Sequence, residues 1–272
     1  MTLENTATPT ALIDGLRCIA LKAGAAIMKH YAAGIEIMRK DDASPVTAAD
    51  HDAERIILAG LKEIAPDTPV ISEEQAAAGH IPAIKNRFFL VDPLDGTREF
   101  INKNGEFTVN IGLIENGVPI AGVVYAPAKH RMFYAGEKTE AYEQIIAPGK
   151  IGNRAGSAPK RIAARRPGPD GLTVVASRSH RDKNTDDYLN AYKVKEFIAA
   201  GSSLKFCLIA AGEADLYPRH GRTMEWDTAA GHAVLRAAGG SVTQLDGQPF
   251  LYGKLEDGLA NPFFVAKGLD KT

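Results

Sequence analysis

Segments with helical spacing of apolar residues alternate along this chain with short segments typical of β-strands, and this alternation is what most constrains the fold. The first segment predicts an amphipathic helix over roughly residues 10–32. Its apolar positions are Leu12, Leu16, Ile19, Ala23 and Ile27. A second helix is predicted after Thr47, with Asp50 near its beginning. Because a helix with one apolar face must cover another layer, a sheet is expected beneath these two.

The strand-like segments are short and rich in β-branched and aromatic residues. They are residues 70–72, 88–91, 107–114, 120–125, 132–135, 173–176 and 216–217. The sequence Glu115-Asn116-Gly117 separates two of them and predicts a β-hairpin, because Asn-Gly favours a tight turn.

The second half of the chain continues the alternation, with helices predicted over residues 203–214 and 227–238. Gly239-Gly240 is expected to end the last of them. Residues 148–169 are polar, contain Gly and Pro and have little periodicity, so a domain boundary is predicted there. The expected fold is a layered sandwich, with an α+β domain in residues 1–150 and an α/β domain in residues 151–272.

The charges of the chain nearly cancel, with 32 Lys and Arg against 33 Asp and Glu. This balance disfavours a nucleic-acid backbone or an anionic membrane as partner, so recognition of any ligand is expected to be local. Two cysteines are too few for a disulfide framework, and no apolar run reaches the roughly 18 residues of a membrane span. A cytoplasmic protein is therefore expected, either monomer or homodimer, with peripheral association at the inner membrane face left open.

The most informative segment for chemistry is Asp92-Pro93-Leu94-Asp95-Gly96-Thr97, which directly follows an apolar strand. Pro93 fixes one φ angle, and Gly96 permits a conformation that other residues resist. The turn can therefore direct both carboxylates and one main-chain carbonyl to a common point. Oxygen ligands of this kind favour Mg²⁺ or Mn²⁺ over zinc.

Three further acidic elements are candidate partners of this turn: Asp50, the pair Glu73-Glu74 and Asp227. Taken alone, each is more typical of a surface charge or a helix cap than of a functional site. Taken together they favour a site, because ligands collect beyond the ends of strands and at the N-termini of helices.

Two motifs carry a resemblance to a known family. Residues 92–100, DPLDGTREF, and residues 226–231, WDTAAG, resemble the two characteristic motifs of the inositol monophosphatase superfamily. Residues 45–50 and 71–74 resemble its upstream acidic elements in the same order. The resemblance implies the αβαβα layered sandwich of these phosphatases. Residues 104–111, 122–127, 176–180 and 201–207 are most similar to its CysQ-type 3'(2'),5'-bisphosphate nucleotidases.

The resemblance also implies roles for individual residues. Glu73, Asp92 and the Leu94 carbonyl would hold one Mg²⁺, and Asp92, Asp95 and Asp227 a second; two or three ions are expected in each active site, with Mn²⁺ as a substitute. Asp50, Glu73 and Thr97 would orient and activate the attacking water. The substrate would contact Glu73, Leu94, Asp95, Gly96, Thr97 and Asp227 of the cation site, together with His180, Ser202, Lys205 and Arg219.

The activity that the resemblance implies is hydrolysis of the 3'-phosphate of adenosine 3',5'-bisphosphate, or of its sulfated analogue, with sensitivity to lithium. An inositol phosphate or sugar phosphate phosphatase would share every cation ligand and differ in the pocket. A non-catalytic nucleotide sensor with the same fold is a third possibility. The intact acidic set argues against it, because a degenerate site would be expected to have lost at least one of these residues.

Overall fold

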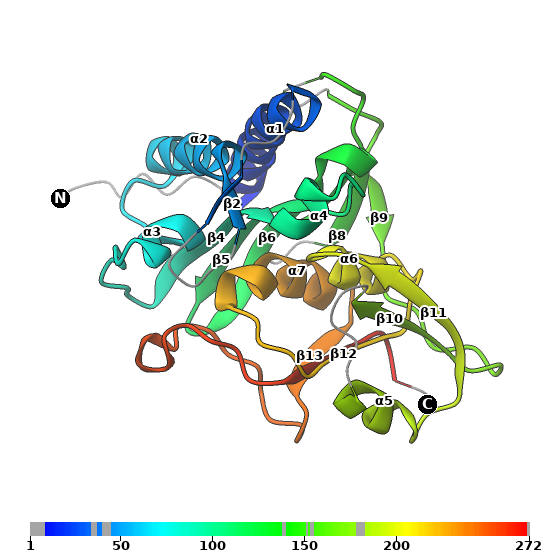
Figure 1. Cartoon of the computed structure of the whole chain (residues 1–272). Coiled ribbons are helices and arrows are strands. Elements are labelled where there is room, and N and C mark those ends of the chain that lie inside the picture. Colours follow the sequence, from blue (N-terminus) through cyan, green and yellow to red (C-terminus); the bar gives the residue numbers. More distant parts are fainter. Residues whose placement is uncertain are drawn as a thin grey trace.

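Helices and sheets alternate through the molecule in five layers (Figure 1). The computed structural model describes residues 9–33, 37–39, 45–137, 140–150, 152, 155–177 and 183–270. The first layer holds the long helices α1 (Pro9–Ala33) and α2 (Ala48–Ile64), as predicted. Next to α2, β1 (Ile37–Arg39) and β2 (Pro45–Thr47) form a separate two-stranded sheet.

The second layer is a seven-stranded sheet in the order β3-β4-β5-β6-β7-β8-β9. The strands are β3 (Val70–Ser72), β4 (Arg87–Asp95), β5 (Thr108–Glu115), β6 (Val118–Ala126), β7 (Arg131–Ala135), β8 (Ala141–Ile145) and β9 (Lys160–Ile162). Only β3 and β4 run parallel among its neighbouring pairs. The predicted hairpin joins β5 to β6, and both of its turn residues, Asn116 and Gly117, have positive φ angles, of 51° and 76°. Such angles match the twist of the two strands.

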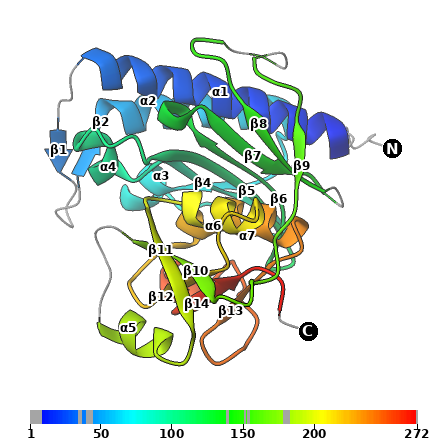
Figure 2. The same ribbon diagram turned by 90° about the vertical axis from the view of Figure 1, so that its right-hand side faces the viewer.

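The third layer consists of α6 (Leu204–Ala210) and α7 (Glu225–Ala237), which lie between the two larger sheets (Figure 2). Two glycines of the larger sheet allow α7 to approach it closely. A Cβ atom on Gly122 would lie 2.6 Å from the Ala230 carbonyl oxygen, and one on Gly112 would lie 2.8 Å from the Ala229 Cβ. The prediction of a helix over 203–214 is wrong at its C-terminal end, because the chain turns at Gly212, where φ is +70°.

The fourth layer is a five-stranded sheet in the order β11-β10-β12-β14-β13. Its strands are β10 (Leu172–Ser177), β11 (Val194–Ala200), β12 (Leu216–Arg219), β13 (Ser241–Gln244) and β14 (Phe264–Lys267). The short helix α5 (Lys183–Leu189) lies against its outer face (Figure 2) and completes the αβαβα order. The layered sandwich predicted from the sequence is therefore confirmed.

The chain passes from the larger to the smaller sheet between Ile162 and Leu172. One hydrophobic core joins both sheets to the middle helices, with Leu90 from β4, Val234 from α7 and Phe264 from β14 among its members. A division into two domains near residue 150 stays a prediction. None of the described helices is long and apolar enough to cross a membrane.

Candidate active site

A cavity of about 330 Å³ lies where the end of β4 meets the beginnings of α6 and α7. It collects the predicted site residues from segments far apart in the sequence. Those that line it are Glu73, Asp92, Leu94, Asp95, Gly96, Thr97, Ser202, Lys205, Arg219 and Asp227. Asp50 lies behind Thr97, and His180 falls outside the described residues.

The strand β4 extends to Asp95, beyond its predicted end, and the expected tight turn begins as an irregularity in its pairing with β5 between Asp92 and Asp95. Gly96 has φ +91°, a left-handed conformation that favours glycine, and it precedes the five-residue helix α4 (Thr97–Ile101). The Asp92 carboxylate accepts a hydrogen bond of 3.0 Å from the Leu94 main-chain N–H. This bond holds the turn closed and brings Asp92, Leu94 and Asp95 to the same cavity.

Thr97 and Asp50 form a hydrogen-bonded pair at the back of the cavity. The Thr97 hydroxyl lies 3.3 Å from Asp50 Oδ1 and 3.4 Å from the Leu94 carbonyl oxygen, and it can donate to either. The second carboxylate oxygen of Asp50 accepts from the Thr47 N–H at 2.8 Å and from the Thr47 hydroxyl at 2.7 Å, in the capping box of α2. The N-terminus of α2 therefore fixes the carboxylate that faces Thr97.

The Asp95 carboxylate accepts hydrogen bonds from a side chain and from the main chain, and its pKa is raised. Its Oδ2 accepts from the Asn110 amide at 3.1 Å and from the Ser203 main-chain N–H at 2.7 Å. Burial raises the pKa of Asp95 to about 6, against the opposing effect of the Lys205 ammonium. The ionised form is therefore costly in the protein alone, and a bound cation would favour it.

Asp227 lies in the first turn of α7, where its Oδ2 accepts a 2.8 Å hydrogen bond from the Met224 main-chain N–H. Burial raises its pKa well above the ordinary value, and the nearby carboxylates of Asp95 and Glu73 raise it further. Glu73, the first residue of α3 (Glu73–Ala77), follows β3 directly. Three acidic groups from separate elements thus repel one another across one cavity.

The donor set of this cavity fits a hard divalent cation, because the described residues that line it offer carboxylate and carbonyl oxygens and neither sulfur nor imidazole. In the part of the chain that the structure describes, no three acidic, His or Cys side chains converge into a complete metal site. Such incompleteness is typical of Mg²⁺, which keeps several waters and binds through one or two carboxylates and the phosphate oxygens of a substrate.

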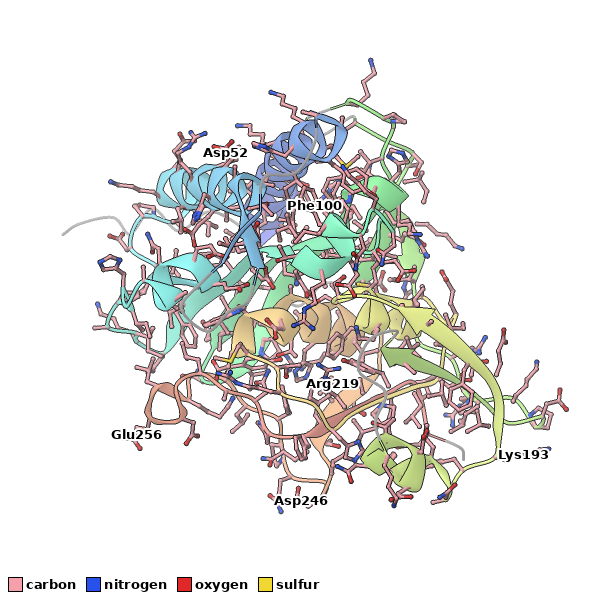
Figure 3. The ribbon with its side chains drawn as sticks, in the orientation of Figure 1. Asp52, Phe100, Lys193, Arg219, Asp246 and Glu256 are labelled. Atoms are coloured by element: carbon pink, nitrogen blue, oxygen red, sulfur yellow. The ribbon has the colours of Figure 1, made fainter. Side chains whose placement is uncertain are left out.

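Three cationic side chains line the same cavity, Arg98, Lys205 and Arg219, and the last two are the predicted substrate contacts. Lys205 is only 6% exposed, and burial lowers its pKa to about 8, while the Asp95 carboxylate opposes this effect. Arg219, at the end of β12 and labelled in Figure 3, donates from Nη2 to the Arg222 carbonyl oxygen at 3.3 Å. Its Nε is buried and has no hydrogen-bond partner among the described residues. An anionic group of a ligand would satisfy both side chains.

Sequence reasoning gave no role to Asn110 and Ser203, although both hydrogen bond to Asp95. One signal was available, since Asn110 is a polar residue in an otherwise apolar stretch of β5, Val109 to Leu113. Its contact with Ser203 joins residues 93 positions apart, and local sequence patterns do not reveal such a pairing.

Comparisons with known proteins agree with this geometry. Residues 10–269 match the model of the inositol monophosphatase family. The 3'(2'),5'-bisphosphate nucleotidase CysQ of Salmonella typhimurium is 48% identical over 248 residues, which cover 90% of this chain and 95% of that protein. CysQ of Escherichia coli K12 is 45% identical over 255 residues, covering 93% and 98%.

Solved structures show the same fold. CysQ from Bacteroides thetaiotaomicron superposes with a TM-score of 0.78 at 39% identity and covers 98% of this chain and 99% of that one. An inositol monophosphatase from Anabaena superposes with a TM-score of 0.73 at 25% identity, covering 96% and 92%. The αβαβα layers, the cluster of carboxylates at the end of β4 and these matches lead to one conclusion: the chain belongs to the inositol monophosphatase family.

Proposed function

We propose that this protein is a Mg²⁺-dependent phosphomonoesterase that hydrolyses the 3'-phosphate of adenosine 3',5'-bisphosphate to AMP and phosphate, and that it also accepts the sulfated analogue. The observation that carries the proposal is the meeting, in one cavity, of an oxygen-only acidic cluster with cationic side chains, of which Lys205 and Arg219 are the predicted substrate contacts. The names of relatives that are 45–48% identical over most of the chain support the same substrate.

Glu73, Asp92, the Leu94 carbonyl, Asp95 and Asp227 are the groups that would hold Mg²⁺. When bound, the cation makes a water molecule easier to deprotonate and neutralises the charge that develops on the phosphoryl and leaving oxygens. The residues of the chain would hold the cation, the water and the phosphate in position. The N-terminus of α7, beside Asp227, adds a partial positive charge for the phosphate.

The attacking water would be held by Thr97. When the hydroxyl proton of Thr97 is directed at Asp50, its lone pairs remain available to accept a hydrogen bond from water. Glu73 lines the same cavity and would take up the proton that the water loses. The new bond forms between the water oxygen and phosphorus, the bond from phosphorus to the 3'-oxygen breaks, and that oxygen gains a proton.

Lys205 and Arg219 would bind the second phosphate of the substrate. The Lys205 ammonium is held in a buried position beside the Tyr217 ring, 5.3 Å from its centroid, and within 3.5 Å of the Ala200 carbonyl oxygen. A phosphate dianion would compensate the cost of burying this charge. Ser202, with φ of +48°, lines the same cavity.

The proposal is tested by phosphate release from Asp227→Asn and Asp95→Asn. Each should lower kcat by about 10³-fold, or roughly 4 kcal/mol, because a cation ligand is lost. The melting temperature should not fall, since each substitution neutralises a buried carboxylate with a raised pKa. The matched control is Asp246→Asn, an exposed position labelled in Figure 3. A chelator should abolish activity and Mg²⁺ restore it. A variant with undiminished turnover would refute the assigned cation site.

A further inference from the structure

Three buried polar side chains stand where the larger sheet meets the middle helices. Thr108 and Asn110, neighbours on one face of β5, are fully buried, and Ser203, before α6, is 1% exposed. Burying an amide or hydroxyl is unfavourable unless hydrogen bonds compensate it, so their partners explain their presence.

The hydrogen bonds of these side chains end on two of the proposed cation ligands. The Asn110 amide donates to Asp95 Oδ2 and, at 3.0 Å, to the Ser203 hydroxyl. The Ser203 hydroxyl in turn donates to the main-chain carbonyl oxygen of Asp227 at 2.6 Å. On the other side, the Thr108 hydroxyl donates to Asn110 Oδ1 at 2.9 Å and fixes the orientation of the amide. A continuous chain of bonds therefore connects Asp95 to the first turn of α7.

Both acidic residues are held in the same manner. Asp95 receives its two hydrogen bonds on Oδ2, and Asp227 receives the Met224 N–H on Oδ2. In each carboxylate, Oδ2 is therefore the oxygen that the described main-chain N–H and amide donors hold. One oxygen of each carboxylate is thus fixed by the protein, and the other is left for a ligand in the cavity that both residues line. Fixing the outer oxygen of a ligating carboxylate is how surrounding groups orient ligands toward a metal.

We infer that Asn110 and Ser203 are positioning residues, which set the distance and orientation of Asp95 relative to Asp227 and thereby the cation affinity of the site. Asp95 belongs to the larger sheet and Asp227 to the middle layer, so no short stretch of chain connects them. Ser203 makes that connection, because its main-chain N–H donates to Asp95 and its hydroxyl to the Asp227 carbonyl oxygen. The Asn110 amide braces it by donating to both Asp95 and the Ser203 hydroxyl. An amide suits this task and a carboxylate does not, because Asp at position 110 would place a second negative charge next to Asp95. The inference rests on the proposed function.

Cation binding by the full chain without substrate tests the inference. Isothermal titration with Mn²⁺ would compare the wild type with Ser203→Ala, Asn110→Leu and Ser203→Thr, alongside melting temperatures. Ser203→Ala and Asn110→Leu should weaken Mn²⁺ binding about tenfold. Ser203→Thr, which keeps the hydroxyl, should bind nearly as the wild type does. Ser203→Ala removes one hydroxyl and is the variant of choice if Asn110→Leu folds poorly.

The matched control is Thr173→Val in β10 of the smaller sheet. This substitution removes a buried hydroxyl that accepts a hydrogen bond from Arg165. It should lower the melting temperature and leave Mn²⁺ affinity unchanged. If Ser203→Ala and Asn110→Leu behave like this control, with affinity within twofold of the wild type, the two residues are merely structural and the inference is wrong while the proposed function stands. A wild-type protein that binds no Mn²⁺, either alone or with inorganic phosphate added to supply the phosphate oxygens, would instead refute the cation site, and this inference with it.

Discussion

At the scale of single residues, Lys205 shows how the site combines opposite charges. Its ammonium is buried on a helix whose other residues are apolar. Burial lowers the pKa of Lys205, and the Asp95 carboxylate partly offsets this decrease. With a pKa of about 8 the side chain stays mainly protonated at neutral pH. A buried ammonium of this kind is suited to recognise a phosphate that the reaction does not cleave.

Lys205→Met should therefore separate binding of the second phosphate from chemistry. For adenosine 3',5'-bisphosphate we expect kcat/KM to fall about 100-fold, because a charge-assisted contact is lost. For adenosine 3'-monophosphate, which lacks the second phosphate, the change should stay within about threefold. Lys62→Met, at an exposed position of α2, is the control. Equal losses on both substrates would show that Lys205 acts at the reaction centre instead.

At the scale of elements, α7 joins the site to the rest of the fold. Its first turn presents Asp227, and its small residues lie against the larger sheet. Gly122→Ala should destabilise the protein by about 2–3 kcal/mol, because the added methyl group would meet the helix backbone. Gly168→Ala has no atom within 4 Å of the new methyl group and should leave the free energy of unfolding nearly unchanged. Urea denaturation measures the free energy of unfolding of both variants. Equal values for Gly122→Ala and Gly168→Ala would contradict the close approach of α7 to the larger sheet.

The same helix carries His232, whose Nδ1 lies 3.1 Å from the Tyr252 hydroxyl. Burial lowers the pKa of His232 to about 3, with a smaller contribution from Arg236. Since the unfolded chain binds this proton near pH 6.5 and the folded protein does not, stability should fall as pH falls below about 6.5. The loss should reach about 3 kcal/mol at pH 4.

His232→Gln should remove that part of the pH dependence, because glutamine does not titrate. Urea denaturation between pH 4 and 7 would measure it, with His51→Gln at an exposed position as the control. A His232→Gln protein with the pH profile of the wild type would show that other groups cause the acid destabilisation.

The elements that sequence reasoning predicted are those with a local signal. The long helices α1, α2 and α7 have clear periodicity, and the β5-β6 hairpin has its Asn-Gly turn. The strands that were missed are β1, β2, β8, β9, β11, β13 and β14. β11 is an edge strand with largely exposed residues, among them Lys195 and Glu196, so it lacks an apolar pattern. The helices α3 and α4 have only five residues each, too few to show a helical period.

At the scale of the whole molecule, the five layers bring distant segments to one cavity. The turn at residues 92–97 was predictable because its chemistry is local, and the remaining ligands because they resemble motifs of a known family. The connection from Asn110 to Ser203 depends on how the larger sheet packs on the middle helices (Figure 2), and no local pattern encodes it. The layered arrangement thus determines both which residues meet and how rigidly they are held.

The central claim is that this cavity hydrolyses a nucleoside bisphosphate, and one measurement tests it most directly. Phosphate release by the purified protein with Mg²⁺ gives kcat/KM for adenosine 3',5'-bisphosphate and for inositol 1-phosphate under the same conditions. We predict a preference for the nucleotide of at least about 100-fold, because only it offers a second phosphate to Lys205 and Arg219. Equal values, or a preference for inositol 1-phosphate, would contradict the account of these two residues.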